Sequence, residues 1–285
     1  MNILCLRYDS KKFNPAFFCW YTKSYLAKDF FRIHTKHAVN QASIPSSAIK
    51  EMPIPDIGLI KQKDIVLSLD RIQKSICEKQ GQLEFLDCLV KSRFMEMFGD
   101  PNHDDLSKSL SLEKCVTIRD EMRKPINGVT RAKMQAGELF PYYGATGQVG
   151  TINEYLSDFE ALCIAEDCGN YGPNEDSTYV ISGKCWVNNH AHLIQCNKNV
   201  DIRYLQHYLN FLDIRQYING ATRSKLTQSA LKTLPILVPS MDQQLEFRRT
   251  IELVDKSRFI VQSQIKDLQE LLDSKMDEYF GGDEE

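Results

Sequence analysis

The side chains that could perform catalysis or bind metal are few in this sequence and poorly spaced. His190 and His192, with Cys185 or Cys196 nearby, could offer nitrogen and sulfur ligands to zinc. Structural zinc sites usually take closely spaced ligand pairs such as Cys-x-x-Cys, and the sequence contains no such pair. We therefore favour hydrogen bonding at a turn or strand end for both histidines, and we expect no metal and no cofactor.

Two other features invite an enzymatic interpretation. Glu166 and Asp167 could form an acid pair, but neighbours on a strand point to opposite faces, so a loop-capping role is favoured. The glycines of Gly144-Ala-Thr-Gly-Gln-Val-Gly resemble a phosphate loop without its lysine-serine ending and following helix, which favours a tight hairpin. The sequence also lacks a methyltransferase motif, a glycine-rich cofactor loop and a nuclease carboxylate motif. We expect no catalytic residue in this chain.

The middle of the chain instead carries side chains that suit DNA. Arginine and lysine can bind guanine edges or phosphates, and asparagine or glutamine can pair with adenine edges in the major groove. Three segments hold such groups, and the segment Arg119 to Lys133 has the pattern of a long flexible loop. The candidates are Arg123, Lys124, Asn127, Thr130, Arg131 and Lys133 in the first segment, Tyr143, Thr146 and Gln148 in the second, and Asn170, Tyr171 and Lys184 in the third.

Short strands and turns are expected to position these segments. Alternating runs bounded by glycine and asparagine predict strands at Ala161–Ala165, Thr178–Ser182 and His192–Cys196, with a turn at Cys168-Gly-Asn-Tyr-Gly-Pro. Trp186 is expected in the core, with Asn188, Asn189 and His190 bracing loops. The stretch from Asp201 to Gly220 predicts one or two helices. These elements indicate a mixed α/β domain of about 135 residues, enough to bury its own core.

An internal repeat sets the wider organisation of the chain. A shift of 182 residues aligns many identical residues of the first hundred with those of the last ninety, which indicates two copies of one structural unit. The aligned pairs are Ser47-Ala48 with Ser229-Ala230, Lys50 with Lys232, Pro53-Ile54 with Pro235-Ile236, Gln62 with Gln244, Leu86 with Leu268, Leu89 with Leu271, Ser92 with Ser274, Glu96 with Glu278, and Phe98-Gly99 with Phe280-Gly281.

Each copy contains a heptad pattern that predicts a long helix of about 35 residues, on the order of 50 Å at ~1.5 Å per residue. A proline-containing stretch precedes each helix, and Gly99 or Gly281-Gly282 follows it. Gly81 weakens the first helix without ending it. Because a two-residue seam is narrow, we expect the helices to pair antiparallel with each other. The seam positions are Ile65, Leu69, Ile72, Ile76, Lys79, Leu83, Leu86, Val90, Arg93 and Met97, then Phe247, Ile251, Val254, Arg258, Val261, Ile265, Leu268, Leu272, Lys275 and Tyr279.

Composition places further limits on the class of protein. The chain has 285 residues, 42% of them hydrophobic, and no apolar run near the ~20 residues of a membrane span. Met1 to Leu6 lacks a secretory core, and nine scattered cysteines suit reduced thiols, so we expect a cytoplasmic protein. The net charge of −3, with an acidic end at Asp283-Glu284-Glu285, argues against bulk electrostatic DNA binding but not against a focused site.

Three ordered motifs carry a family resemblance. They are Pro141-Tyr-Tyr-Gly-Ala-Thr-Gly-Gln-Val-Gly, Ile164-Ala-Glu-Asp-Cys-Gly and Ser182-Gly-Lys-Cys-Trp-Val-Asn-Asn-His-Ala-His. Together with the repeat, they resemble the specificity subunit of Type I restriction-modification systems over nearly the whole chain. The resemblance implies an α+β fold with one target recognition domain between two long helices that form an antiparallel coiled coil.

The resemblance also implies a division of the chain and a function. Residues 1–50 resemble only the tail of a first recognition domain, residues 51–100 and 234–285 the two conserved spacer helices, and residues 101–233 a complete recognition domain. The implied function is to read one half of a split DNA target within a restriction-modification complex. The implied partners are double-stranded DNA, methyltransferase subunits and a restriction and translocation subunit, with a second specificity chain left open.

Two other classes of function stay open at this point. The first is a coiled-coil scaffold that binds only protein, and the second is a zinc hydrolase. DNA binding that depends on salt would distinguish the resemblance-based function from the scaffold. Measuring the metal content of the protein would test the zinc hydrolase hypothesis.

Overall fold

The computed structural model describes residues 4–38, 41–103, 106–167, 169–218 and 225–281. Internal contacts divide the chain into two compact units, which we call the first unit (Met1–Asp87 and Lys256–Glu285) and the second unit (Cys88–Asp255). Each long helix contributes one part to each unit. Cys168 of the predicted turn, Gly220, Gly282 and the acidic end Asp283–Glu285 lie outside the described residues.

The two long helices are α4 (Leu59–Phe98) and α8 (Met241–Phe280), and each has 40 residues. They are longer than the predicted length of about 35 residues, and each begins six residues before its first predicted seam position. In α8 the reason is a capping box, because Ser240 Oγ accepts from the amide of Gln243 while Gln243 Oε1 accepts from the amide of Ser240. Helix α4 ends where Gly99 adopts a positive φ of 80°, a conformation that glycine reaches without strain. Gly81 does not interrupt α4, as predicted.

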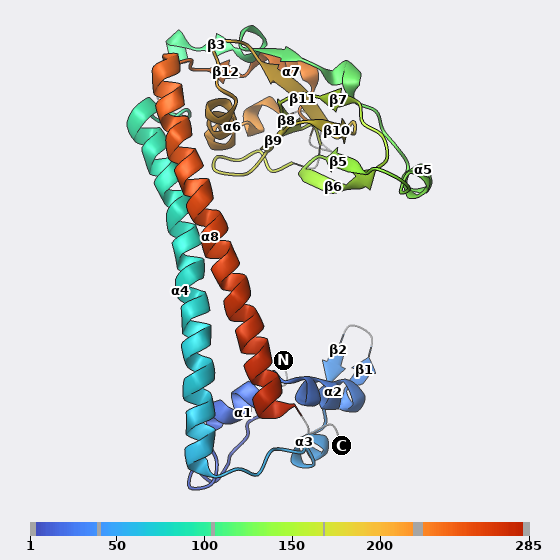
Figure 1. Ribbon diagram of the computed structural model, residues 1–285, viewed down its shortest axis with the longest axis vertical. Helices are drawn as coiled ribbons and strands as arrows, with labels where there is room; N and C mark the ends of the chain where they lie inside the picture. The colour runs from blue at the N-terminus through green and yellow to red at the C-terminus, as the bar shows by residue number, and fades with distance from the viewer. Residues whose placement is uncertain (1–3, 39–40, 104–105, 168, 219–224, 282–285) are drawn as a thin grey trace. The chain divides into compact units, whose positions relative to one another are not determined.

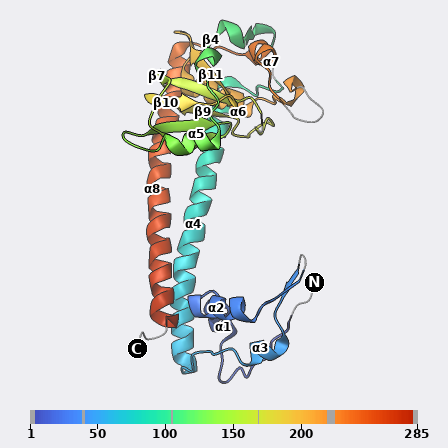
Figure 2. The ribbon, with the colours of Figure 1, turned by 90° about the vertical axis from the view of Figure 1, so that its right-hand side faces the viewer.

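The predicted seam lies between these helices. All twenty seam positions are buried or half-buried. In the first unit, Tyr279 Oη lies 3.4 Å from Ser68 Oγ and Arg258 lies 2.7 Å from Asp87. In the second unit, Arg93 lies 2.5 Å from Glu246. As the residue numbers rise along α4, the numbers of their partners on α8 fall, which confirms the antiparallel pairing (Figures 1 and 2).

The first unit packs short N-terminal elements against the helix pair. Phe17 and Tyr21 of α1 contact Phe280 of α8, with ring centroids 5.3 and 5.7 Å apart, and they share a core with Leu69 and Met276. The short elements are α1 (Pro15–Tyr21), α2 (Tyr25–His34), the hairpin of β1 (Lys36–Ala38) and β2 (Gln41–Ser43), and α3 (Ser46–Lys50).

The second unit contains two four-stranded sheets, in the orders β6-β5-β10-β7 and β4-β11-β8-β9, and a short pair β12-β3. Only the pair of β10 with β5 is parallel. The strands are β3 (Leu110–Ser111), β4 (Val116–Ile118), β5 (Phe140–Gly144), β6 (Gly147–Ile152), β7 (Ser157–Asp158), β8 (Ala161–Ala165), β9 (Thr178–Ile181), β10 (Lys184–Val187), β11 (Ala191–Cys196) and β12 (Pro235–Ile236).

Helices flank these sheets. Helix α6 (Ile202–Phe211) contacts β8 and β9, and the short turn η4 (Arg215–Tyr217) follows it, as the sequence predicted. The other helical elements are η1 (Leu106–Lys108), η2 (Leu112–Lys114), η3 (Asp120–Met122), α5 (Gly128–Lys133) and α7 (Gln228–Thr233). The predicted strands are confirmed as β8, β9 and β11, and the glycine-rich segment forms the β5–β6 hairpin.

The fold class is α+β, as predicted. Trp186 is buried with 3% exposure and donates from Nε1 to the carbonyl of Lys124 at 2.8 Å, which confirms its place in the core. The eight described cysteines are free thiols. Among the helices of the described residues, none has an 18-residue stretch apolar enough to cross a membrane.

Candidate nucleic-acid interface

The segment from Arg119 to Lys133 is more ordered than the predicted flexible loop. It contains η3 and the one-turn helix α5. Asn127 caps α5, because its Oδ1 accepts from the amide of Thr130 at 2.8 Å. The prediction of a flexible loop was wrong because the Asn127 cap, a local helix-start signal, was not weighed against Pro125 and Gly128.

Half of the twelve candidate residues are exposed at or beside two neighbouring elements of the second unit. Helix α5 is followed by Gln135, which donates to the carbonyl of Thr151 in the β5–β6 hairpin at 2.7 Å; Figure 1 labels these elements. The guanidinium carbon of Arg131 lies 5.6 Å from the ring centroid of Tyr142, an aromatic contact that fixes the direction of this half-buried side chain. The exposed candidates in this region are Lys124, Asn127, Thr130 and Lys133 around α5, and Thr146 and Gln148 on the hairpin.

The third predicted segment is less coherent. Asn170 is exposed, but Tyr171 is only 6% exposed and donates its hydroxyl to the carbonyl of Ala165 at 3.2 Å. Lys184 is exposed at the start of β10, and its Nζ lies 5.1 Å from the Tyr155 ring centroid and 5.7 Å from that of Phe140. Lys184 therefore belongs to the sheet that carries the hairpin.

Two further candidates have structural partners. Tyr143 is half-buried and stacks on Tyr179 with centroids 5.6 Å apart, and burial raises the pKa of its hydroxyl. Arg123 has only 13% of its side chain exposed. DNA contact by either residue stays a prediction, and each would have to leave these packed positions to reach a base.

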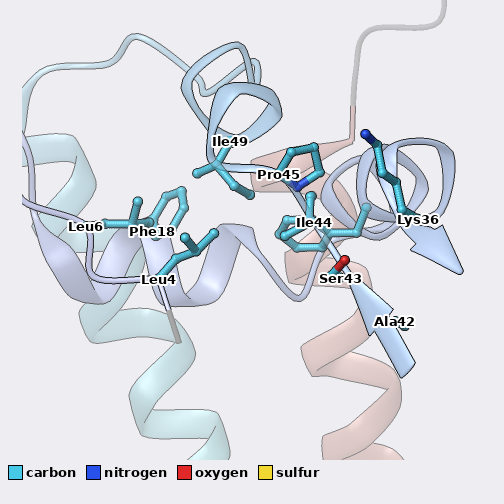
Figure 3. A pocket seen from close by; sticks show the side chains of 10 residues that line it. Leu4, Leu6, Phe18, Lys36, Ala42, Ser43, Ile44, Pro45 and Ile49 are labelled. Carbon is cyan, nitrogen blue, oxygen red and sulfur yellow. The ribbon is translucent and has the colours of Figure 1, made fainter. Parts of the chain in front are cut away.

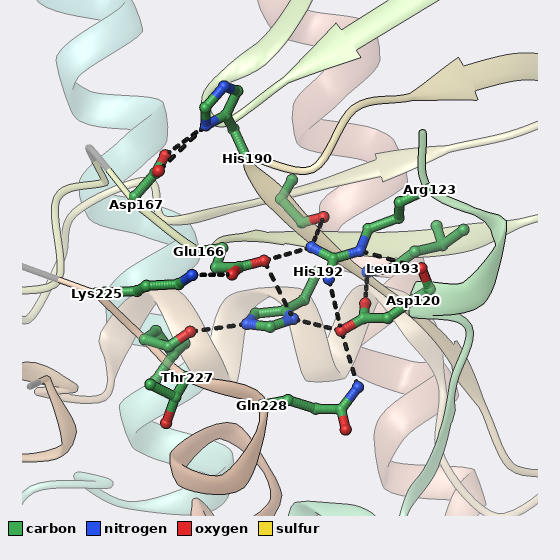
Figure 4. Close-up of polar contacts among 12 residues, drawn as sticks. Asp120, Arg123, Glu166, Asp167, His190, His192, Leu193, Lys225, Thr227 and Gln228 are labelled. Carbon is green, nitrogen blue, oxygen red and sulfur yellow. Dashed lines mark hydrogen bonds and ion pairs between the residues drawn. The ribbon is translucent and has the colours of Figure 1, made fainter. Parts of the chain in front are cut away.

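Arg123 belongs to a buried network of charged side chains from four parts of the second unit (Figure 4). Its guanidinium lies 2.5 Å from Glu166 and 3.0 Å from Asp120, and it donates to the carbonyl of Ala191 at 2.9 Å. Lys225 lies 2.7 Å from the other oxygen of Glu166. The network joins η3, the end of β8, β11 and the segment that precedes α7.

His192, which is 1% exposed, lies at the centre of this network. Its Nδ1 lies 2.7 Å from Asp120 Oδ2, and its Nε2 lies 2.7 Å from the carbonyl oxygen of Leu226. Both partners of the ring, a carboxylate and a backbone carbonyl, are hydrogen-bond acceptors. Asp120 also accepts from Gln228 and from the amide of Leu193, each at 3.0 Å.

The pKa values of both carboxyls are lowered. Burial alone would raise the pKa of Asp120, but the hydrogen bond and charge of His192, with the bonds from Gln228 and Leu193, lower it further than burial raises it. For Glu166, burial again opposes ionisation, and Lys225, Arg123 and His192 outweigh it. The network is therefore ionic at neutral pH.

The neighbouring histidine has a carboxylate partner of its own. His190 lies in the turn before β11, and its Nδ1 is 2.9 Å from Asp167 Oδ1. The structure supports hydrogen bonding for both histidines, as the sequence suggested. In the described part of the chain, no group of three or more His, Cys, Asp and Glu side chains is arranged to hold a metal ion.

Asp120 and Lys225 were not predicted as site residues. Asp120 and His192 are 72 positions apart, and Lys225 is 59 positions beyond Glu166, so no local spacing joins them. The sequence motifs around Glu166 and His192 supply one part of the network. The other part comes from η3 and residues 225–228, which pack against the sheet in the folded chain.

The second unit thus combines two four-stranded sheets with exposed polar residues beside α5, and both units share the paired helices. A family model of the Type I restriction modification DNA specificity domain matches residues 120–270, more than half of the chain. The chain therefore belongs to this family.

Relatives of known sequence agree with this membership. A putative type I restriction enzyme specificity subunit of Haemophilus influenzae, S.HindORF215P, is 29% identical over 141 residues, which are 50% of this chain and 35% of that protein. The putative MjaX specificity subunit of Methanocaldococcus jannaschii is 23% identical over 278 residues, 90% of this chain and 64% of that protein. The chain thus spans less than two thirds of the length of either relative.

Two solved structures share the fold. A Type I restriction-modification S subunit from M. genitalium has a TM-score of 0.62 at 14% identity, over 94% of this chain and 73% of that chain. A structure from a study of complex assembly and conformational transition of the type I R-M system has a TM-score of 0.59 at 15% identity, over 98% and 74% of the two chains.

Proposed function

We propose that this chain is the DNA sequence-specificity component of a Type I restriction-modification complex, and that its second unit reads one half of a split target. The observation that carries the proposal is the family match across residues 120–270, which includes every strand of the two four-stranded sheets except β4, and the exposed residues beside α5. The relatives that are named as specificity subunits support it.

The proposed DNA-contacting surface is α5 with the β5–β6 hairpin. Lys124, Arg131 and Lys133 supply positive charge that suits phosphates, and Asn127, Thr130 and Gln148 supply groups that suit base edges. Arg123 acts in this proposal by holding η3, which precedes α5, against the sheet. The chain has a net charge of only −3, so we expect weak DNA binding by the chain alone.

Partners and location follow from the same proposal. The chain assembles with methyltransferase subunits and with a restriction and translocation subunit in the cytoplasm, and it contributes no catalytic residue. Purified chain with S-adenosylmethionine and DNA is expected to transfer no methyl groups. Methyl transfer by the chain alone would show that a catalytic function had been missed.

The DNA-contacting surface can be tested by removing its charge. Arg131→Ala with Lys133→Ala should weaken duplex binding and reduce the slope of log affinity against log salt by about 2, because each lost phosphate contact removes ~0.9 from the slope. Fluorescence anisotropy over a salt series, with and without the methyltransferase, measures both quantities.

Two comparisons make this test specific. Lys124→Ala with Lys133→Ala removes two exposed charges and leaves the Arg131–Tyr142 contact in place, so it separates charge loss from local unfolding. Lys61→Ala with Lys63→Ala removes two exposed charges from α4 and should leave the affinity of the chain alone unchanged. Equal binding by all variants at every salt concentration would reject the proposed surface.

A further inference from the structure

The sheet β6-β5-β10-β7 of the second unit has two faces with different surroundings (Figure 1). Cys185 of β10 points to the inner face, where it shares a core with residues of β8 and β11. Its neighbours Lys184 and Trp186 point to the opposite, outer face. The register pairs Trp186 with Tyr142 of β5, so Phe140, two positions before Tyr142, lies on the outer face as well.

Lys184 is exposed, and its ammonium is held by two aromatic rings on this face. Its Nζ lies 5.7 Å from the ring centroid of Phe140 and 5.1 Å from that of Tyr155, which follows β6. At these distances a cation is attracted to the negative face of a ring. An ammonium has three N–H donors, so contact with two rings leaves a donor available to an acceptor outside the protein.

The outer face also carries part of the proposed DNA-contacting surface. The guanidinium carbon of Arg131 in α5 lies 5.6 Å from the ring centroid of Tyr142. Tyr142 and Phe140 are two residues apart on β5, which is ~6.7 Å along a strand. Lys184 therefore lies on the same face as the cation of α5, at the next ring along β5.

Asp158 of β7 stands directly opposite Lys184 in the antiparallel register, and it is exposed. Side chains that are directly opposite share a face, with Cβ atoms ~5 Å apart, which is close enough for an ion pair. Within the described part of the chain, these two charges do not form one, because the ammonium lies over the rings. The outer face thus presents a donor and an acceptor side by side.

The surroundings of this pair are unsuited to a phosphate. Glu154 directly precedes Tyr155, and Glu138 lies in the segment that leads into β5; both are exposed. Together with Asp158 they give three exposed carboxylates in the strands and turns that meet Lys184. Carboxylates repel phosphate groups, so a contact with the DNA backbone is disfavoured here.

The edge of a G·C base pair in the major groove matches the pair of side chains. Lysine binds the adjacent O6 and N7 acceptors of guanine, and aspartate accepts from the N4 amino group of cytosine. In an A·T pair the adenine N6 donor lies between the N7 and O4 acceptors, so two adjacent acceptors are not offered to an ammonium. A donor beside an acceptor on one protein face therefore favours G·C.

The apolar groove of the first unit carries no such pair (Figure 3). Its volume is about 1020 Å³, and its lining includes Leu4, Leu6 and Ile49. Among the described residues that line it, Lys36 is the one cation and none is a carboxylate. The inference is therefore confined to the second unit.

We propose that Lys184 and Asp158 read one G·C pair of the DNA target, with Lys184 donating to guanine and Asp158 accepting from cytosine. Phe140 and Tyr155 act as positioning residues, because they hold the ammonium away from the Asp158 carboxylate. The inference rests on the proposed function, and it adds the β7–β10 end of the sheet to the DNA-contacting surface.

Methylome sequencing of cells that express the chain with its methyltransferase tests the pair on the target itself. Lys184→Ala and Asp158→Ala should each relax the target at the same single G·C position and leave its other positions unchanged. The preference for G·C at that position should fall about 10-fold or more, the usual effect of losing a good base contact. Lys184→Arg should keep the preference, because arginine binds the same guanine atoms.

Duplex binding by the complex of chain and methyltransferase measures the contact directly. Fluorescence anisotropy compares the target duplex with one that carries 7-deazaguanine, which lacks the N7 acceptor, at the assigned position. The complex with the unmodified chain should lose about 5-fold in affinity on this substitution, the effect of one hydrogen bond. The complex with Lys184→Ala should lose nothing further.

Two matched variants remove the same charges elsewhere in the second unit. Lys198→Ala lies after β11, and Glu160→Ala lies between β7 and β8; both positions are exposed. They should leave the target sequence unchanged and preserve the 5-fold effect of 7-deazaguanine. Relaxation of the same G·C position by either control would overturn the assignment to Lys184 and Asp158.

Other results would also overturn the pair. They are a target part without any G·C position, relaxation at different positions by the two variants, and an unchanged target with Lys184→Ala. A uniform loss of affinity with the salt slope lowered by ~0.9 would show a phosphate contact instead. If Arg131→Ala with Lys133→Ala still weakens binding in these cases, the pair is wrong and the proposed function stands. If no variant alters binding, the proposed DNA-contacting surface fails as well.

Discussion

His192 connects two parts of the second unit that are far apart in the sequence. Its Nδ1 contacts Asp120 of η3 on one side, and its Nε2 contacts the backbone carbonyl of Leu226 on the other. Arg123 and Lys225 bind Glu166 in the same network. Residues that lead into α5 are thereby fixed to the segment that leads into α7 and α8, so the proposed DNA-contacting surface has a rigid base.

This network predicts a loss of stability in acid. The pKa of Asp120 is lower in the folded chain than its unfolded value of about 3.9. A lowered folded-state pKa contributes stability above the unfolded pKa, and that stability is lost as the pH falls through the folded-state pKa. Asp120→Asn should lower the free energy of unfolding of the second unit by roughly 3 kcal/mol at pH 7, since it removes one of the two carboxylates that face Arg123 in a buried site.

Urea unfolding between pH 7 and pH 3 measures this effect. The Asp120→Asn chain should show a flatter dependence of the unfolding free energy on pH below about pH 5 than the unmodified chain. Asp158→Asn, at an exposed position of β7, serves as the control and should follow the unmodified chain. Parallel curves for Asp120→Asn and the unmodified chain would contradict an ionic role for Asp120.

Residue types indicated the chemistry of the site better than its geometry. Four of the candidates are exposed on or near α5 and the β5–β6 hairpin, as a surface for DNA requires: Lys124, Asn127, Lys133 and Gln148. Their contact with bases stays a prediction. The sequence gives no sign that Arg123 is held by carboxylates, because Glu166 is 43 residues away. Burial and partners over such separations depend on the folded sheet and not on local composition.

At the level of elements, the repeated glutamines are the joints between short and long helices. Each of Gln62 and Gln244 accepts from one backbone amide and donates to two backbone carbonyls. A leucine of similar size would leave these backbone groups unpaired, and buried unpaired groups are costly. This explains why a polar residue persists in both copies within an otherwise apolar contact.

Gln244→Ala should therefore destabilise the second unit by about 1–3 kcal/mol, the usual cost of leaving buried hydrogen-bonding groups without partners. The amide of Asp201 loses its acceptor, so the start of α6 should also exchange its amide hydrogens faster. Thermal unfolding and hydrogen exchange measure the two effects. Gln264→Ala, at an exposed position of the same helix, is the matched control and should change stability little; equal stability of both variants would contradict the joint.

The elements were the most predictable part of the structure. Heptad spacing predicted the seam of α4 and α8, because apolar residues repeat with a period near 3.5 where one narrow helix face is buried. Alternation bounded by glycine predicted β8, β9 and β11. The short helix α5 was missed and the start of α8 was not predicted, since each depends on a single cap, at Asn127 and Ser240, and not on a long periodic signal. The division of the chain at residues 50, 100 and 233 stays a prediction.

At the scale of the whole protein, one complete recognition sheet implies a limited contribution to any DNA target. The proposed surface of α5 and the β5–β6 hairpin reads one part of the target. Two copies of this chain related by a two-fold axis would recognise a palindrome in two parts, whereas a complex with a second and different reader would recognise an asymmetric sequence in two parts.

The spacing between the two parts has an upper limit. A straight helix of 40 residues is ~60 Å long at ~1.5 Å per residue, which corresponds to at most roughly 18 base pairs at ~3.4 Å each. Methylome sequencing of cells that express this chain with its methyltransferase gives the target sequence directly. Asn127→Ala with Gln148→Ala should relax one part of the target and leave the other part and the spacing unchanged, because both residues lie on one surface of the second unit. Lys61→Ala with Lys63→Ala on α4 should leave both parts intact. A palindromic target would show that two copies of this chain read the DNA, and an undivided target would contradict the spacer role of α4 and α8.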